Sequence, residues 1–182
     1  MSVCLIDCIY SLRAKYFSVT VPIVDRYAER FMSGNKYSAG DNLKELINHI
    51  DEVGGAINFA RDILKNMQVL GTFRKSEVVY KLAKKLLSLG INTMEDFKNY
   101  KDQTMLEMVV HNTDGIGDAG TNYLFMLAGS DDRCKPDVHI HHCIRDAIGY
   151  DISNNECQIL MKQAVEKLKP EVWDMLEYVI KD

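Results

Sequence analysis

A tight, glycine-containing turn separates two short stretches with helical periodicity. Residues 113–117 read TDGIG, and the apolar spacing before them (105–110) and after them (119–128) predicts a helix on each side. Glycine adopts positive φ and lets another backbone approach closely, which suits a sharp hairpin. The start of the second helix leaves unpaired backbone N–H groups that can bind a phosphate oxygen, although an ordinary helix–helix corner is the alternative. The candidate phosphate contacts are Gly115, Ile116 and Gly117.

One acidic residue, Asp137, follows this turn at the predicted start of another helix. It lies twenty residues after Gly117, in the sequence KPDVHI. An aspartate between a proline and an apolar run is a good helix N-cap, because its carboxylate accepts a hydrogen bond from a backbone N–H. A carboxylate held in a water-poor cleft also stabilises developing positive charge far better than solvent does. Both the capping role and a catalytic role are open for Asp137, and the two can coexist.

Six side chains that bind metals crowd into ten residues: Cys134, Asp137, His139, His141, His142 and Cys143. On a helix, Asp137 and His141 share one face and His139 and Cys143 share another, so a four-ligand site is conceivable. The segment contains neither a C-x2-C nor an H-x3-H pair, which are the usual spacings of zinc ligands. The sequence therefore predicts no metal and no cofactor, and a metal-dependent hydrolase is kept as a third alternative.

The hairpin, the helix after it, a loop and then DVHI at 137–140 together resemble the helix-hairpin-helix DNA glycosylases. That superfamily includes endonuclease III and 3-methyladenine glycosylase II. Near the N-terminus, SLRAK at 11–15 followed by Ser18 and Val19 is similar to the segment of endonuclease III that helps fill the gap left by a flipped base. The resemblance covers most of the chain, and residues 105–149 carry its specific motifs.

The resemblance implies two helical lobes around a cleft that receives an extruded nucleotide. It also implies that Gly115 and Gly117 contact a DNA phosphate through their backbone N–H groups. Asp137 is then the carboxylate that stabilises the oxocarbenium-like sugar or orients the attacking water while the N-glycosidic bond breaks. The expected partner is double-stranded DNA, which we also expect four basic side chains to contact: Arg13, Lys81, Lys84 and Lys85.

Three departures from the family pattern refine this expectation. Bifunctional members carry a Schiff-base lysine two residues after the second hairpin glycine, and this chain has Ala119 there. The neighbouring Asp118 places a negative charge where relatives often carry arginine, which lowers affinity for a polyanion. Endonuclease III holds an iron–sulfur cluster on four closely spaced C-terminal cysteines, but the last cysteine here is Cys157. A monofunctional glycosylase without a cluster fits better than a lyase.

The elements that position these residues are predicted to be helices. Leu5, Ile9, Leu12 and Tyr16 mark one helix near 2–16, and a second stripe of Val78, Leu82, Leu86 and Leu89 stops at Gly90. A C-terminal stripe over 172–180 predicts a helix that starts at Pro170. Residues 17–24 alternate partly like a strand, but Pro22 disfavours a strand and we predict a helix. The predicted fold is all-α, with about ten short helices.

The polar loop 130–136 divides the predicted chain into two lobes. Residues 1–130 form a lobe that contains the helix-hairpin-helix (105–129), and residues 131–182 form a C-terminal lobe that carries Asp137. A length of 182 residues with 47% hydrophobic residues is enough for one buried core or for two lobes.

Composition and charge indicate the cellular compartment more clearly than they indicate the function. Five scattered cysteines indicate free thiols in a reducing compartment, and the start of the chain has no basic region typical of a signal peptide. No window is apolar for long enough to cross a bilayer, so we expect a cytoplasmic protein, associated with the nucleoid in a prokaryote. The net charge of −4 does not indicate a DNA-binding protein, but residues 74–85 hold five basic residues against one acid. A solvated helix face explains that cluster equally well.

The sequence thus predicts a monofunctional DNA N-glycosylase that removes a damaged or mispaired base by hydrolysis. A non-catalytic helix-hairpin-helix module that binds DNA or a protein partner is the alternative, because Asp118, the acidic net charge and the missing lysine all permit it.

Overall fold

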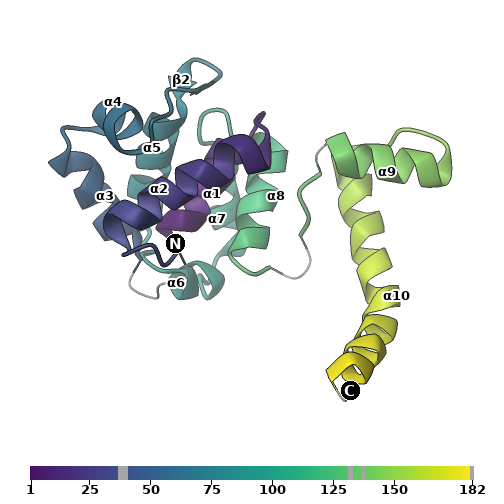
Figure 1. Ribbon diagram of the computed structural model, residues 1–182. Helices are drawn as coiled ribbons and strands as arrows, with labels where there is room; N and C mark the ends of the chain where they lie inside the picture. The colour runs from purple at the N-terminus through teal and green to yellow at the C-terminus, as the bar shows by residue number, and fades with distance from the viewer. Residues whose placement is uncertain (37–40, 131–132, 137, 181–182) are drawn as a thin grey trace. The chain divides into compact units, whose positions relative to one another are not determined.

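The computed structural model describes residues 1–36, 41–130, 133–136 and 138–180, the last twelve of these by their backbone only. Helices dominate the chain (Figure 1). The elements before the turn at residues 113–117, in chain order, are α1 (Ser2–Ser11), η1 (Tyr16–Thr20), α2 (Val21–Phe31), α3 (Leu43–Glu52), α4 (Ala56–Asn58), η2 (Phe59–Ile63), β1 (Val69–Leu70), β2 (Phe73–Arg74), α5 (Lys75–Ser88), α6 (Met94–Lys98) and α7 (Gln103–His111). The label η marks a short π-helix. After the turn come α8 (Gly117–Leu127), α9 (Val138–Ile148) and α10 (Asn154–Ile180).

The predicted all-α class is confirmed. Within the described residues the only sheet is the antiparallel pair β1–β2, with two residues in each strand. The chain divides into two compact units, Met1–Ser130 and Asp131–Asp182. Among the described residues, no helix combines the length and the apolar character that crossing a bilayer requires.

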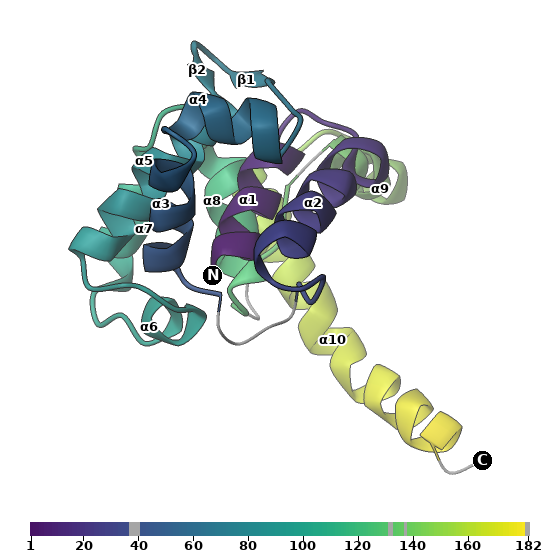
Figure 2. The same cartoon turned by 60° about the vertical axis from the view of Figure 1, so that its left-hand side comes forward.

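Helix α1 is the centre of the first unit. It contacts α2, α5 and α8, and Figure 2 shows it between α2 and α8. Its side chains are apolar on almost every side, which is the pattern of a helix that packs on all faces. Leu5, Ile6, Ile9 and Tyr10 are fully buried. The sequence therefore correctly predicted a helix here. It predicted one buried face, whereas the structure buries the helix on nearly all sides.

Helix α1 ends earlier than the predicted boundary near residue 16. Leu12 is extended, with φ −66° and ψ 121°, and Arg13 then takes a φ of +54°, which turns the chain out of the helix. Tyr16 consequently starts η1 instead of extending the stripe of α1. The ambiguous segment 17–24 is helical, as predicted, because η1 runs directly into α2 with Pro22 in its first turn.

Helix α5 follows the predicted pattern closely. Val78, Leu82 and Leu86 are buried, the helix ends at Ser88, and Gly90 has a φ of +81°. Lys75 departs from the predicted basic patch because it is only 2% exposed. Its ammonium group donates hydrogen bonds to the carbonyl oxygens of Tyr10 (2.9 Å) and Leu12 (2.7 Å). The basic surface of α5 therefore has one charge fewer than the sequence suggested.

The second unit contains α9 and α10, which pack on each other. Ile144 of α9 and Cys157 of α10 are buried, and Nε2 of His141 lies 2.8 Å from Oδ1 of Asn154. Helix α10 continues through Pro170, so the predicted start of a new helix at that residue is wrong. Proline at that point removes one backbone hydrogen bond, and the helix accommodates this cost within its length.

Candidate nucleic-acid interface

The turn between α7 and α8 is closed by its own backbone. The Thr113 N–H donates to the Val110 carbonyl (3.0 Å), and the Ile116 N–H donates to the Thr113 carbonyl (3.1 Å). Ile116 is 4% exposed and joins the hydrophobic core. Burial of the Ile116 side chain therefore anchors the turn in the hydrophobic core. Of its two neighbours, Gly115 is exposed and Gly117 is half-buried.

Both glycines of the turn are required by its conformation. Gly115 has a φ of +82°, and a Cβ there would lie 2.7 Å from Cγ of Leu70 in the β-hairpin. Gly117 has a φ of +57°, but a Cβ there would meet nothing within 4 Å. Positive φ is costly for residues with a Cβ. Gly115 thus permits close packing, whereas Gly117 keeps an open surface at the first residue of α8.

The start of α8 is able to bind an anion. Its first residues have backbone N–H groups without partners inside the helix, and the helix dipole adds partial positive charge there. Within the described part of the chain, no side chain caps this end of α8. An oxygen atom of an anionic ligand is the natural partner for such groups.

Two of the three predicted lysines of α5 reach the turn. The Lys81 ammonium group pairs with the Asp114 carboxylate, and Nζ of Lys85 donates to Oγ1 of Thr113 (3.0 Å). Lys81 also lies over the Phe73 ring of β2, 5.2 Å from its centroid. Phe73, Lys81 and Lys85, which are far from residues 113–117 in the sequence, are therefore gathered around this one turn.

Lys84 has a different environment. Its ammonium group lies over the Tyr80 ring, 4.0 Å from the centroid, and the Tyr80 hydroxyl group donates to Asp51 of α3. The hydrogen bond with Tyr80 raises the pKa of Lys84. The structure therefore does not bring Lys84 to the turn, even though it neighbours Lys85 in the sequence.

Arg13 lies just beyond a residue that packs on α8. Cδ1 of Leu12 lies 3.1 Å from the position that a Cβ of Gly120 would take. Arg13 itself is exposed, and among the described residues no acidic side chain pairs with it. Arg13 is thus a further exposed cationic side chain, just after α1, and Lys75 donates a hydrogen bond to the carbonyl oxygen of the preceding residue, Leu12.

The acidic residues near the turn have basic partners. Asp114 pairs with Lys81, and Oδ1 of Asp118 lies 3.0 Å from Nε2 of His111. The Lys81 ammonium group lowers the pKa of Asp114. Both acids therefore lie beside a basic side chain at the turn.

The predicted catalytic residue, Asp137, lies outside the described residues. Helix α9 begins at Val138, directly after it. The described neighbours of the conceivable metal site make other contacts: the Cys134 N–H donates to Oε1 of Gln158 (2.9 Å), and His141 contacts Asn154. Over the described ranges, no three His, Cys, Asp or Glu side chains are grouped closely enough to hold a metal ion.

Sequence reasoning missed three contributors to this region. Thr113 binds Lys85, Phe73 contacts Lys81, and Leu70 fills the space beside Gly115. The available signal was Gly71 between two β-prone residues on each side, which is a short hairpin pattern. That signal predicts a hairpin, but its packing against residue 115 depends on the tertiary fold.

Comparison with known proteins assigns the chain to a family. A family model described as "Domain of unknown function (DUF8548)" matches residues 1–181. No curated protein and no solved structure matches the chain. Because the family model spans nearly the whole length, the chain belongs to the DUF8548 family.

Proposed function

We propose that this protein binds double-stranded DNA through the α7–α8 turn and acts on it as a monofunctional DNA N-glycosylase. The observation that carries the proposal is the meeting of Lys81 and Lys85 with the turn that contains Gly115 and Gly117. The turn lies between two helices, α7 and α8, which is compatible with a helix-hairpin-helix, and the lysines supply positive charge beside it.

The binding step uses the chemistry of phosphate recognition. No side chain accepts a hydrogen bond from the backbone N–H groups at the start of α8, and Gly117 has no Cβ to block an approaching phosphate. Lys81 and Lys85 neutralise phosphate charge, which contributes affinity without regard to sequence. In this proposal the lysines exchange their present partners, Asp114 and Thr113, for DNA phosphates when the complex forms.

The catalytic step rests on Asp137. Its carboxylate stabilises the positive charge that develops on the deoxyribose as the N-glycosidic bond breaks, and it orients the water that attacks the sugar. The base must leave the stack before this bond is accessible, so a cleft for an extruded nucleotide belongs to the proposal. Ala119 stands where a Schiff-base lysine is needed for strand cleavage, which restricts the reaction to hydrolysis.

The binding step is tested with two matched glycine variants. Gly117 and Gly90 both have positive φ and both have open space for a Cβ. Replacing either by alanine should cost a similar stability of about 1–2 kcal/mol. Gly117→Ala should weaken binding to a DNA duplex by roughly tenfold, the loss of about one charge-assisted hydrogen bond, and Gly90→Ala should leave it unchanged. Fluorescence anisotropy with labelled duplexes measures both, and equal affinity of the two variants would reject the turn as the DNA contact.

The catalytic step is tested by base release. Duplexes that contain uracil, alkylated purines, oxidised pyrimidines or mismatches are incubated with the protein, and free base is quantified. We expect release from at least one duplex, an abasic strand that stays intact until alkali is added, and no covalent complex after borohydride treatment. Asp137→Asn should abolish release and retain DNA binding.

The alternatives predict other outcomes of the same experiment. DNA binding without any base release from the wild-type protein would support a non-catalytic binding module, which the acids Asp114 and Asp118 at the turn favour. Simultaneous loss of folding and binding in Asp137→Asn would assign that residue to helix capping. A borohydride-trapped complex would show that a lysine acts covalently.

A further inference from the structure

A cavity of about 440 Å³ lies beside α1 in the first unit. Its wall combines apolar side chains, including Val24 and Leu127, with the polar or charged side chains of Asp7, Tyr16, Lys36 and Asp41. Pockets for small ligands are concave, mostly apolar, contain a few well-placed polar groups and occupy roughly 300–1,000 Å³. Tyr16 is 38% exposed, so the wall of the cavity reaches the protein surface.

Asp7 is an unusual residue for the centre of a core helix. It is 8% exposed, and its two carboxylate oxygens accept hydrogen bonds from the hydroxyl groups of Tyr16 (2.8 Å) and Tyr123 (2.8 Å). Burial, and after it the hydrogen bond to Asp7, raises the pKa of Tyr123, so this hydroxyl remains a donor at neutral pH. Over the described ranges, no lysine, arginine or histidine pairs with Asp7.

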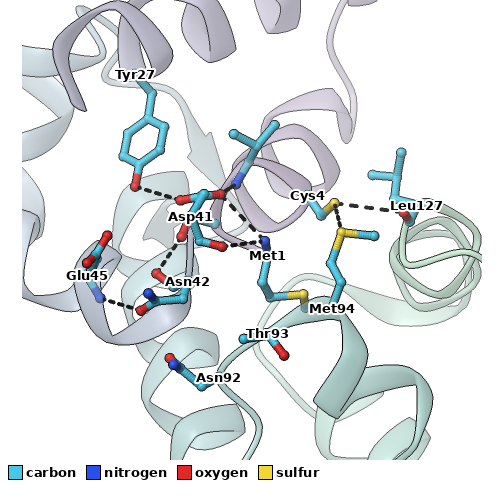
Figure 3. Close-up of polar contacts among 12 residues, drawn as sticks. Met1, Cys4, Tyr27, Asp41, Asn42, Glu45, Asn92, Thr93, Met94 and Leu127 are labelled. Atoms are coloured by element: carbon cyan, nitrogen blue, oxygen red, sulfur yellow. Dashed lines mark hydrogen bonds and ion pairs between the residues drawn. The ribbon is translucent and has the colours of Figure 1, made fainter. Parts of the chain in front are cut away.

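The second carboxylate in the cavity wall, Asp41, is matched within the protein. Figure 3 shows its side chain beside the α-amino group of Met1, at 3.5 Å, and beside the Tyr27 hydroxyl group. The Val3 N–H also donates to it (2.9 Å). A third acid close by, Asp25, pairs with Lys36 at 2.6 Å. Asp7 is thus the carboxylate in this wall without a cationic partner from the described part of the chain.

A buried carboxylate without a counter-charge loses several kcal/mol of hydration, which two phenol hydrogen bonds compensate only in part. A cation in the adjoining cavity supplies the missing charge. The largely apolar wall favours an organic cation over a hydrated metal ion, and the Tyr16 ring offers a cation–π contact. We propose that the cavity binds a small organic cation with an apolar body, with Asp7 as its counter-charge and Tyr16 as its aromatic partner.

The proposal is independent of DNA binding, so the test uses the full-length protein without nucleic acid. The probe is N-methylquinolinium, and the matched neutral ligand is quinoline at a slightly alkaline pH, where it is uncharged. Isothermal titration calorimetry and thermal shift measure binding of each ligand. The charged ligand should bind at least about tenfold more tightly than the neutral one, because only it pairs with Asp7.

Three variants separate the site from general effects. Asp7→Asn should remove the preference for the charged ligand, and Tyr16→Ala should weaken its binding severalfold. Asp62→Asn serves as the control, because Asp62 is also acidic and is paired, with Arg61 at 2.6 Å, but does not line the cavity. Its binding should match that of the wild-type protein.

Several results would overturn the proposal: no binding of N-methylquinolinium, equal binding of both ligands, or a cation preference that survives in Asp7→Asn. Circular dichroism reports whether each variant is folded. If Asp7→Asn fails to fold, Tyr16→Ala decides, because Tyr16 is partly exposed and its ring is not required for the core. Unchanged cation binding in folded Tyr16→Ala then rejects the site.

Discussion

Lys75 illustrates how a single residue can be assigned to the wrong environment. In the sequence it belongs to a basic run, and charge alone places such residues on a solvated face. In the fold its ammonium group donates hydrogen bonds to two carbonyl oxygens at the end of α1 and to Oε1 of Gln68, at 3.3 Å. The positive φ of Gly115 and Gly117 was predicted correctly, because glycine is the residue type that takes positive φ most readily. The residue type alone does not reveal that a lysine such as Lys75 is buried.

Lys75→Met is therefore expected to destabilise the protein by about 1–3 kcal/mol, because the carbonyl oxygens of Tyr10 and Leu12 lose a buried donor. Lys84→Met is the control, since Lys84 is exposed, and its effect should be within about 0.5 kcal/mol. Urea unfolding followed by circular dichroism measures both. A Lys75→Met protein as stable as the wild type would show that the ammonium group does not anchor α1.

At the scale of elements, periodicity predicted where helices form better than where they end. The stripe of α5 and its stop at Gly90 are as expected, since both depend on local residue types. The end of α1 depends on Arg13 leaving the helical region and on Leu12 packing against α8, which are tertiary effects. The passage of α10 through Pro170 was likewise not predictable from a rule that treats proline as a helix start.

The packing of α1 against α8 gives a prediction at this scale. A Cβ on Gly120 would lie 2.7 Å from Cγ2 of Ile116 and 3.1 Å from Cδ1 of Leu12, so a larger side chain must push the two helices apart. Gly120→Leu should cost about 1–3 kcal/mol, as overpacking of a core does. Ala119→Leu, one residue earlier and half-buried, should cost clearly less. Thermal unfolding compares them, and equal losses would mean that the interface tolerates the added volume.

At the scale of the whole molecule, net charge and local charge lead to different expectations. The total of −4 does not indicate a DNA-binding protein, but the fold gathers Lys81 and Lys85 at the turn that holds the two glycines and the acids Asp114 and Asp118. The sequence predicted the turn and the lysines separately, and it could not show which lysines face the turn. Helical phase over 81–85 and the position of α7 decide that Lys85 does and that Lys84 does not.

The most direct test of this account is the salt dependence of DNA affinity. The logarithm of the association constant for a duplex, measured by anisotropy, should fall linearly with the logarithm of salt concentration, because phosphate contacts release counterions. Lys81→Met and Lys85→Met should each reduce the magnitude of the slope by about one, and Lys84→Met should leave it unchanged. Affinity that does not depend on salt, no binding at low salt, or an equal effect of Lys84→Met and Lys85→Met would contradict DNA binding at the α7–α8 turn.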